Sequence, residues 1–184
     1  QPLFYFKNNM GKSCLNKLSG NITVDCTIPQ VGVKNLYLMH AEDVTLTYAG
    51  AQVSGVAFAP GSAAILVEGY KQNIQVTTAI RATDAASRLD TSVAFKVSGH
   101  NTEDYLRVNS LLTGRFYVAA EYPNGANTFM GVQAPLECSG MDWDSNANAG
   151  LMTVTLAAPE GSAGNQLMRA STVAMGQIKS KVGV

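Results

Sequence analysis

Apolar and polar residues alternate along much of the chain with a period of two residues. In the run DVTLTY, for example, Val44, Leu46 and Tyr48 would share one face of a strand and leave two threonines on the other. Alternation of this kind, with β-branched and aromatic residues, is typical of half-buried strands. The pattern predicts strands at 33–40, 43–48, 73–80, 92–97, 115–122, 128–138 and 151–157.

One stretch breaks this rhythm and predicts a single helix at about 102–113. Asn101 or Thr102 can cap its start, and acidic residues follow in the first turn, where they suit the positive end of a helix. Its apolar positions recur roughly every 3.6 residues. They are Tyr105, Leu106, Val108, Leu111 and Leu112. Gly114 follows them, so we expect it to end the helix with a positive φ.

Clusters of glycine, proline, asparagine and aspartate separate the predicted strands. The clearest contains Asn124 and Gly125, a strong signal for a tight turn between two strands. Strands joined by turns, with one helix beside them, indicate a mainly β (α+β) fold of the β-sandwich type with one flanking helix. We expect its core at 33–160, between an N-terminal arm at 1–32 and a C-terminal arm at 161–184.

Neither expected arm shows a sustained period. The first contains three consecutive aromatic residues, Phe4, Tyr5 and Phe6, which would be costly to leave in water and are candidates for contacts between subunits. In the second, apolar residues are widely scattered, so an extended arm or an added edge strand fits it better than a packed helix. Such arms rarely stay ordered on a lone monomer, and they indicate assembly.

Composition narrows the classes of function. The 184 residues suit one domain, and 14% of them are charged, against roughly 25% in typical soluble domains. A surface so poor in charge is expected where other subunits cover it. The formal net charge is zero, which argues against tight nucleic-acid binding and against a polybasic membrane contact. No apolar run approaches the roughly 20 residues that span a bilayer.

Cysteines are odd in number, so a disulfide framework is not indicated. They are Cys14, Cys26 and Cys138. We expect free thiols, although Cys14 and Cys26 would close a loop if oxidised. The first residues lack the basic and apolar regions of an intact signal peptide, and removal of an earlier segment stays open.

The sequence lacks the usual motifs of catalysis and metal binding. His40 and His100 each follow a strand-like run, and no pair of Cys or His has the spacing of zinc ligands. Neither a nucleophile elbow nor a phosphate-binding loop occurs. We therefore expect no enzymatic activity and no cofactor.

One polar string has oxygen-bearing side chains at alternate positions, as calcium loops do. They are Asp142, Asp144, Asn146 and Asn148. Ala147 and Thr153 stand where an EF-hand needs glycine and glutamate, so a polar loop between strands is the better interpretation. Trp143, the sole tryptophan, lies in this string as either a core residue or an exposed interface anchor.

The central part of the chain, roughly residues 32–160, resembles tail-tube-like virion proteins of tailed bacteriophages, especially phages of gut Bacteroidota. The shared pattern is a short helix, a GRF strand, an Asn-Gly turn, an F-x-G strand, a Gly-rich polar loop and a T-x-T strand before a Pro-acidic step. The matching positions are Gly114, Arg115, Phe116, Asn124, Gly125, Phe129, Gly131, Thr153, Thr155, Pro159 and Glu160. The two expected arms fall outside the resemblance.

This resemblance implies a β-sandwich subunit of the virion, in the tail or connector, that assembles in the host cytoplasm with other virion proteins. Six or more copies would form a ring around a channel, and the genome DNA would pass through it without tight binding. Strand faces that carry Thr45, Thr77 and Thr153 are candidates for the channel lining. Tail tube, head–tail ring and capsid decoration protein all stay open. A carbohydrate- or calcium-binding β-sandwich module is the alternative from another class.

Overall fold

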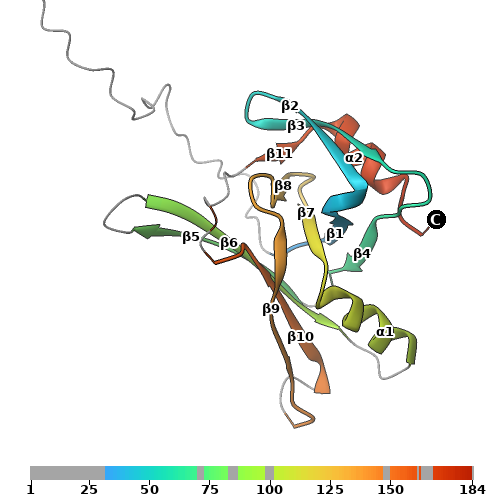
Figure 1. Cartoon of the computed structure of the whole chain (residues 1–184), viewed down its shortest axis with the longest axis vertical. Coiled ribbons are helices and arrows are strands. Elements are labelled where there is room, and N and C mark those ends of the chain that lie inside the picture. Colours follow the sequence, from blue (N-terminus) through green and yellow to red (C-terminus); the bar gives the residue numbers. More distant parts are fainter. Residues whose placement is uncertain are drawn as a thin grey trace, which may run out of the picture.

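The computed structural model describes residues 32–183, with gaps at 70–72, 83–86, 98–101, 147–149, 161 and 163–167. In chain order (Figure 1) the elements are β1 (Asn35–His40), the 3₁₀ turn η1 (Ala41–Asp43), β2 (Val44–Ala49), β3 (Gln52–Phe58), β4 (Ile65–Glu68), β5 (Ile74–Ala82), β6 (Ser87–Val97), α1 (Thr102–Leu111), β7 (Arg115–Glu121), β8 (Asn127–Met130), β9 (Leu136–Trp143), β10 (Met152–Ala157), β11 (Arg169–Ala170) and α2 (Thr172–Lys179). The predicted mainly β fold with a flanking helix is confirmed.

The strands form two sheets. The larger sheet has eight strands in the order β4-β1-β7-β9-β10-β6-β5, with β8 paired to β7, and the smaller has the order β11-β3-β2. Strand β9 pairs with β7 only at Leu136 and Glu137, and from Glu137 onward it pairs with β10. The large sheet therefore bends at β9, which joins the half containing β4, β1, β7 and β8 to the half containing β10, β6 and β5.

Strand β1 is buried on both faces. Leu36 and Leu38 point into one hydrophobic cluster, and Tyr37 and Met39 point into another. Its partner β7 is also buried on both faces, because Val118 and Ala119 belong to different clusters. The pair β1–β7 is therefore the middle layer of the molecule.

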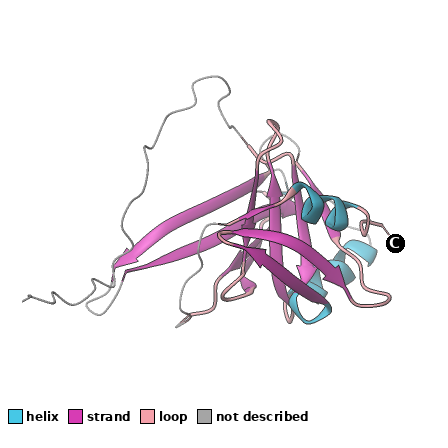
Figure 2. Cartoon of the chain, turned by 90° about the horizontal axis from the view of Figure 1, so that it is seen from above, coloured by secondary structure: helices cyan, strands magenta, loops and turns pink. Residues whose placement is uncertain are grey.

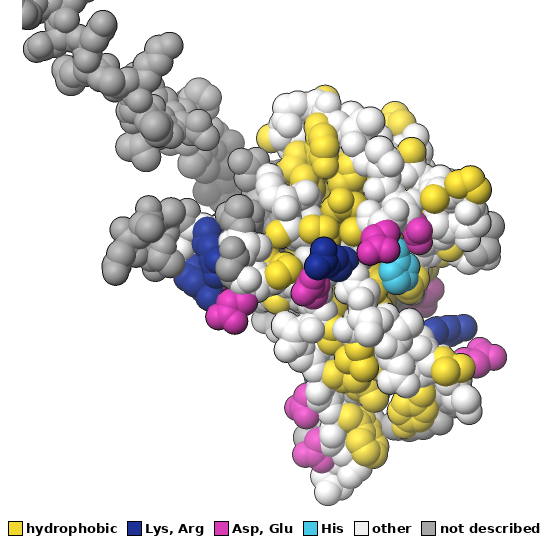
Figure 3. Space-filling view, viewed as in Figure 1, with side chains coloured by type: hydrophobic (Ala, Val, Ile, Leu, Met, Phe, Trp, Pro, Cys, Tyr) yellow, Lys and Arg dark blue, Asp and Glu magenta, His cyan; other side chains and the backbone are white. Residues whose placement is uncertain are grey.

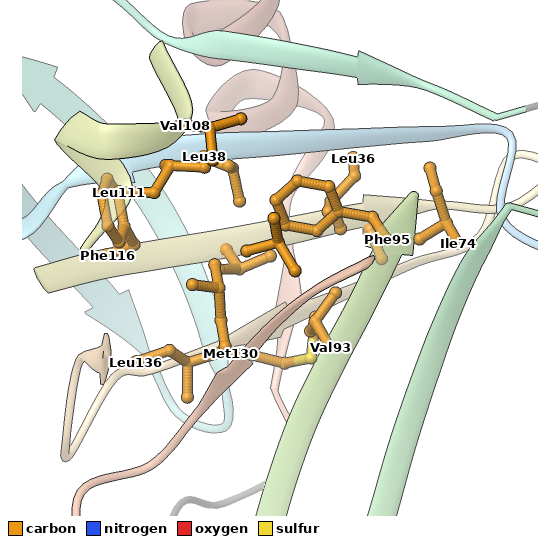
Figure 4. Close-up of a cluster of buried hydrophobic side chains, with 14 residues drawn as sticks. Leu36, Leu38, Ile74, Val93, Phe95, Val108, Leu111, Phe116, Met130 and Leu136 are labelled. Carbon is orange, nitrogen blue, oxygen red and sulfur yellow. The ribbon is translucent and has the colours of Figure 1, made fainter. Parts of the chain in front are cut away.

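The first cluster, here called the sheet cluster, lies between the two halves of the large sheet and against α1 (Figure 4). Its buried members are Leu36, Leu38, Ile74, Val93, Phe95, Val108, Leu111, Phe116, Val118, Ala120, Met130, Leu136, Val154 and Leu156. Because strand side chains alternate between faces, the period-two pattern of the sequence supplies nearly all of it.

The second cluster, here called the C-terminal cluster, fills the space between β1–β7 and the small sheet. Its buried members are Tyr37, Met39, Val44, Val53, Val56, Ala64, Ala119, Phe129, Met168, Ala170, Ala174, Met175 and Ile178. The last five come from the segment that contains β11 and α2, at the top of Figure 1. This segment closes the cluster.

The prediction for residues 161–184 is confirmed in one part, because β11 is an added edge strand of the small sheet, but the expectation that no packed helix forms there is wrong. Ser171 caps α2 by accepting a hydrogen bond from the backbone N–H of Ala174, and the helix buries Ala174, Met175 and Ile178. The stripe is hard to see in the sequence because its first member is a small alanine. The larger neighbour, Val173, is 65% exposed.

Other strands also differ from the prediction, and among them β6 begins at Ser87 rather than at 92. Strands β3 and β4 were not expected, because glycine, alanine and proline interrupt their pattern. The expected strand at 128–138 is divided into β8 and β9, since Gly131 adopts φ 91° and Pro135 follows shortly after it. Strand β9 then continues to Trp143, through the first part of the expected polar loop.

Candidate assembly surfaces

The β5–β6 hairpin extends beyond the rest of the molecule (Figures 1 and 2). Its register places Ile74 opposite Phe95 and Ile80 opposite Leu89. Both pairs lie on one face of the hairpin, because residues two apart along a strand point the same way. The first pair is buried in the sheet cluster, whereas Ile80 is 75% exposed and Leu89 is half-buried. Beyond the buried Thr91, the core-facing side thus continues as a partly exposed apolar pair, Ile80 and Leu89, here called the hairpin strip.

The opposite face of the same hairpin end is charged. Asp90 lies between two arginines, with one carboxylate oxygen 2.7 Å from Nε of Arg81 and the other 3.2 Å from Nε of Arg88. Arg88 also donates through Nη1 to the carbonyl of Ser162 at 3.0 Å. Two arginines and one aspartate leave a net charge of +1 on this face. The hairpin end is therefore amphipathic.

The far end of the β9–β10 hairpin has the same amphipathic character with the opposite charge. Met152 lies opposite Trp143 on one side and Val97 on the other, in line with the sheet cluster. Trp143 is 51% exposed, although the cluster continues up to it. Asp142 points to the other face, and both it and Asp144 are exposed. Figure 3 shows acidic side chains at this end and basic and acidic side chains at the end of β5–β6.

The outer face of β5, β6 and β10, away from the sheet cluster, carries uncharged residues in register between Lys96 at one end and Arg81, Arg88 and Asp90 at the other. Thr155 lies opposite Ala94, which lies opposite Gln75, and Thr77 lies opposite Ser92 in the next row. None of these side chains is buried. Thr77 and Thr153, predicted as lining candidates, lie on this face, whereas Thr45 belongs to the small sheet.

A polar network attaches α2 to the middle layer. The carboxylate of Glu121 accepts hydrogen bonds from the Tyr37 hydroxyl at 3.1 Å, from Asn35 Nδ2 at 3.2 Å and from Lys179 Nζ at 2.6 Å. The side chain of Glu121 is 12% exposed, and that of Lys179 is 46% exposed. The network closes the C-terminal cluster on its polar rim.

These contacts shift the pKa values of three groups. Burial raises the pKa of the Tyr37 hydroxyl, and the adjacent Glu121 carboxylate raises it further. Burial alone would raise the pKa of Glu121, but hydrogen bonds from Lys179 and Asn35 outweigh it and hold that pKa below the usual value. The hydrogen bond to Glu121 raises the pKa of Lys179. The geometry favours a neutral tyrosine beside a charged pair, which holds a helix in place.

Gly114 follows α1, as predicted, but for a different physical reason. Its φ is not positive, so it does not end the helix in the expected conformation. A Cβ at this position would overlap the ring of Phe116, which is fully buried and cannot move away. That ring also contacts the His40 ring in a tilted arrangement, with centroids 4.8 Å apart. Gly114 is therefore required by packing, and Phe116 is a core residue rather than an interface residue.

The helix stripe is only partly buried. Val108 and Leu111 belong to the sheet cluster, whereas Leu106 is 65% exposed and Leu112 is 51% exposed. The other apolar residues of the predicted stripe lie at its rim or on its outer side.

The turn between β7 and β8 is the one predicted. Gly125 adopts φ 80°, and the side chain of Asn124 accepts a hydrogen bond from Ala126 N–H at 3.0 Å. Both residues belong to the turn of a hairpin. No contact among the described residues brings them near Trp143. Phe4, Tyr5 and Phe6 lie outside the described residues.

The structure describes the calcium-like string only in part. Asp142 belongs to β9, and Asp144 accepts the backbone N–H of Asn146 at 2.8 Å. Asn148 lies outside the described residues. Within the part of the chain that the structure describes, no group of three or more His, Cys, Asp or Glu side chains could hold a metal ion. None of the described helices has the length and apolar character needed to cross a membrane.

Comparison of the chain with models of known families, with curated proteins and with solved structures found no match in any of the three.

Proposed function

We propose that this chain is a structural virion protein of a tailed bacteriophage, which assembles with copies of itself into a ring or tube around a channel for the genome. The observation that carries the proposal is the hairpin strip. A two-stranded hairpin is marginally stable in water when its apolar face is uncovered. Ile80 and Leu89 extend such a face beyond the body, so a neighbouring subunit is the natural cover.

The outer face of β5, β6 and β10 supports the channel. Gln75, Thr77 and Thr155 give the middle of this face hydrogen-bonding capacity without charge, and the charged residues Lys96, Arg81, Arg88 and Asp90 stand at its ends. A lining of this kind makes few phosphate contacts, so it lets DNA slide, whereas each neutralised phosphate would add affinity. The resemblance of residues 32–160 to tail-tube-like proteins supports the same function.

Sedimentation and negative-stain imaging of the purified protein test the proposal. We expect rings or tubes, and their loss in a variant with Ile80→Asn. Leu106→Asn is the matched control, because Leu106 is similarly exposed but lies on α1. A wild-type chain that stays monomeric at every concentration would overturn the proposal. A monomer whose Trp143 fluorescence changes with sugars would favour the carbohydrate-binding alternative.

The free subunit should also bind duplex DNA weakly. A dissociation constant below about 1 μM at physiological salt, tighter than the usual non-specific range, would contradict a sliding channel. Fluorescence anisotropy with a labelled duplex measures it. The outcome is independent of the imaging result, because a ring that holds DNA tightly would still image as a ring.

A further inference from the structure

We infer that in the assembled protein β11 and α2 of one copy fill the C-terminal cluster of the next copy. Residues 168–182, which contain both elements, are here called the strap. In a single copy the strap fills its own cluster. The inference rests on the proposed self-assembly and goes beyond it, because each copy would complete its core with a segment from a neighbour. The binding of the strap, the path of the chain that leads to it and the charge pair that holds it support the exchange.

The start of the strap is bound as an added strand. The carbonyl of Met168 accepts the backbone N–H of Phe129 in β8 at 2.8 Å. The next two residues, which form β11, pair in parallel with Gln52 and Val53 of β3. The strap therefore enters between β8 and β3, which belong to different sheets. Addition of an extended segment to a strand edge is a common way in which proteins bind peptides.

The rest of the strap is bound as a helix in a groove, a second common mode of peptide binding. Helix α2 buries one side in the C-terminal cluster. The side chain of Gln177 accepts the backbone N–H of Val56 at 2.8 Å, and the carbonyl of Lys181 accepts that of Ala64 at 3.0 Å. All of these contacts join the strap to other parts of the fold. They would therefore be the same whichever copy supplied it, as in domain swapping.

The chain reaches the strap by way of the protruding β5–β6 hairpin. After β10 the backbone N–H of Ala158 donates to the carbonyl of Thr91 at 3.4 Å, and the carbonyl of Ser162 accepts Nη1 of Arg88 at 3.0 Å. Arg88 lies opposite Arg81, near the far end of the hairpin. The hairpin extends beyond the rest of the molecule there (Figures 1 and 2).

The strap thus starts close to the surface that the proposed neighbour covers. It begins at Met168, six residues after Ser162, and six extended residues span at most about 22 Å. A neighbour that covers the hairpin strip would therefore lie within reach of the strap. Because the connection is short, an exchanged strap would tie the two copies closely together.

The charge pair favours the strap of a second copy as the occupant. Nζ of Lys179 lies 2.6 Å from a carboxylate oxygen of Glu121, whose side chain is 12% exposed. Loss of the cation beside a carboxylate that is largely buried is costly. The site therefore favours a segment with a cation at this position, and the strap of a second copy supplies one.

Exchange would also give a contact that repeats. The strap and the site that receives it are different surfaces, so the contact is heterologous. Each copy would give one strap and receive one. Such a contact continues from copy to copy until it closes as a ring or grows as a helical tube.

Cross-linking of the assembled wild-type protein tests the inference directly. A carbodiimide joins a carboxylate to an amine in direct contact as an amide, and the carbodiimide takes up the water that is lost. We expect links between Glu121 and Lys179 of different copies, which give covalent dimers and longer chains on a denaturing gel. Lys179→Arg keeps the charge but cannot form this amide, so it is the matched control and should lack the link. A Glu121–Lys179 link found only in chains of monomer mass would overturn the inference.

Charge exchange provides a second test, with the assembled fraction measured by sedimentation at low ionic strength. Glu121→Lys and Lys179→Glu each bring like charges together, so each variant alone should assemble several-fold less than the wild type. When both chains are produced together, exchange pairs opposite charges at both sites. Assembly should then recover, with both chains in the particles. Without exchange the like charges stay together in each chain, so an absence of recovery would count against the strap.

Glu103→Lys and Arg107→Glu are the matched controls for this test. Their side chains are 3.5 Å apart and exposed, and both belong to α1, so exchange of the strap does not separate them. Each variant alone should assemble like the wild type. Circular dichroism confirms that each variant is folded.

The outcomes separate this inference from the function beneath it. Rings or tubes that contain only internal Glu121–Lys179 links would overturn the exchange and leave the proposed function intact. Linked dimers without rings or tubes would support the exchange and overturn the proposed channel. A wild-type chain that stays monomeric would overturn both.

Discussion

The two hydrophobic clusters on either side of β1 are assembled differently. The sheet cluster draws its residues from strands spread between β1 and β10, so the bend of one sheet closes it. The C-terminal cluster stays open until β11 and α2 pack over Tyr37, Met39 and Phe129. The first cluster is thus a property of a whole sheet, and the second depends on one short segment. From this difference we predict that the two faces of β1 lose order separately.

The segment that closes the second cluster is attached through backbone edges as well as side chains. Strand β11 pairs in parallel with Gln52 and Val53 of β3, and beyond it Gln177 accepts the backbone N–H of Val56 at 2.8 Å. Asn127 exchanges two hydrogen bonds with the backbone of Ala170. These contacts join the small sheet to β8 and leave the sheet cluster untouched.

The largest loss of stability is expected from a substitution in the sheet cluster. Phe116→Ala should lower the free energy of unfolding by about 3–5 kcal/mol, because it removes a fully buried aromatic ring and leaves a cavity. Chemical denaturation measures it. Tyr48→Ala, at a residue that is 51% exposed, is the control and should cost less than about 1 kcal/mol. Similar losses in the two variants would contradict the burial of Phe116.

A smaller and more local effect is expected from the C-terminal cluster. Ile178→Ala should cost about 2–5 kcal/mol, and the cost should appear as faster amide exchange in β11, α2 and β3. Amides of β6 and β10 should keep their protection, because their side chains belong to the other cluster. Val173→Ala, on the exposed side of the same helix, serves as the control. Uniform loss of protection would show that the clusters unfold together.

A further prediction concerns Gly114, which follows α1 and lies against Phe116 of the sheet cluster. Gly114→Ala should destabilise by about 1–3 kcal/mol, the usual cost of overpacking, and Phe116→Leu in the same chain should recover part of the loss. Thermal melting of the single and double variants measures this. Gly176→Ala, where an added Cβ meets no atom within 4 Å, should gain up to about 1 kcal/mol of helix stability. Additive losses in the double variant would refute the clash.

The smallest effect concerns the Glu121 network, and it depends on pH. Because the folded-state pKa of Glu121 is lowered, its contribution is present above the usual value of 4.5 and is lost as the pH falls through the folded-state pKa. Glu121→Gln should therefore cost roughly 1 kcal/mol at neutral pH, discounted for the exposed lysine. The difference should shrink on acidification.

At alkaline pH the stability that this network contributes falls as the pH rises. The raised pKa values of Tyr37 and Lys179 contribute stability below their usual values of 10.0 and 10.5, and this is lost as the pH rises through the folded-state values. Urea denaturation of the wild type and of Glu121→Gln across pH measures both limbs. Glu103→Gln, whose side chain is 79% exposed, is the control. A difference between Glu121→Gln and wild type that stays constant below pH 4.5 would contradict the network.

The sequence predicts the sheet cluster well and the C-terminal cluster poorly, for a physical reason. Strands such as β7 and β10 carry their own alternation, so Val118 or Val154 is recognisable from its neighbours alone. The buried residues of α2 include Ala174, whose small side chain gives little signal until Met39 and Phe129 are known to lie opposite. Burial of that kind is decided by tertiary contacts.

The candidate assembly surface was predictable only in part. The alternation shows Ile80 on the same face as Ile74, but the sequence does not reveal where the body of the molecule stops. Trp143 was expected in a loop, and the choice between core and surface required the length of β9. The ion pairs of Asp90 with Arg81 and Arg88 can be recognised only when the register of β5 and β6 is known.

Strand β11 and α2 have a consequence for the timing of folding on the ribosome. They follow every other described element along the chain, yet they fill a space between β1, β3 and β8. At a synthesis rate of about 5–20 residues per second, β1 waits for several seconds before Met168 and Ile178 emerge. During that interval Phe129 and Met39 face water or a chaperone on one side, while the other side of β1 is free to pack. The nascent chain thus passes through a half-closed state whose lifetime is set by translation.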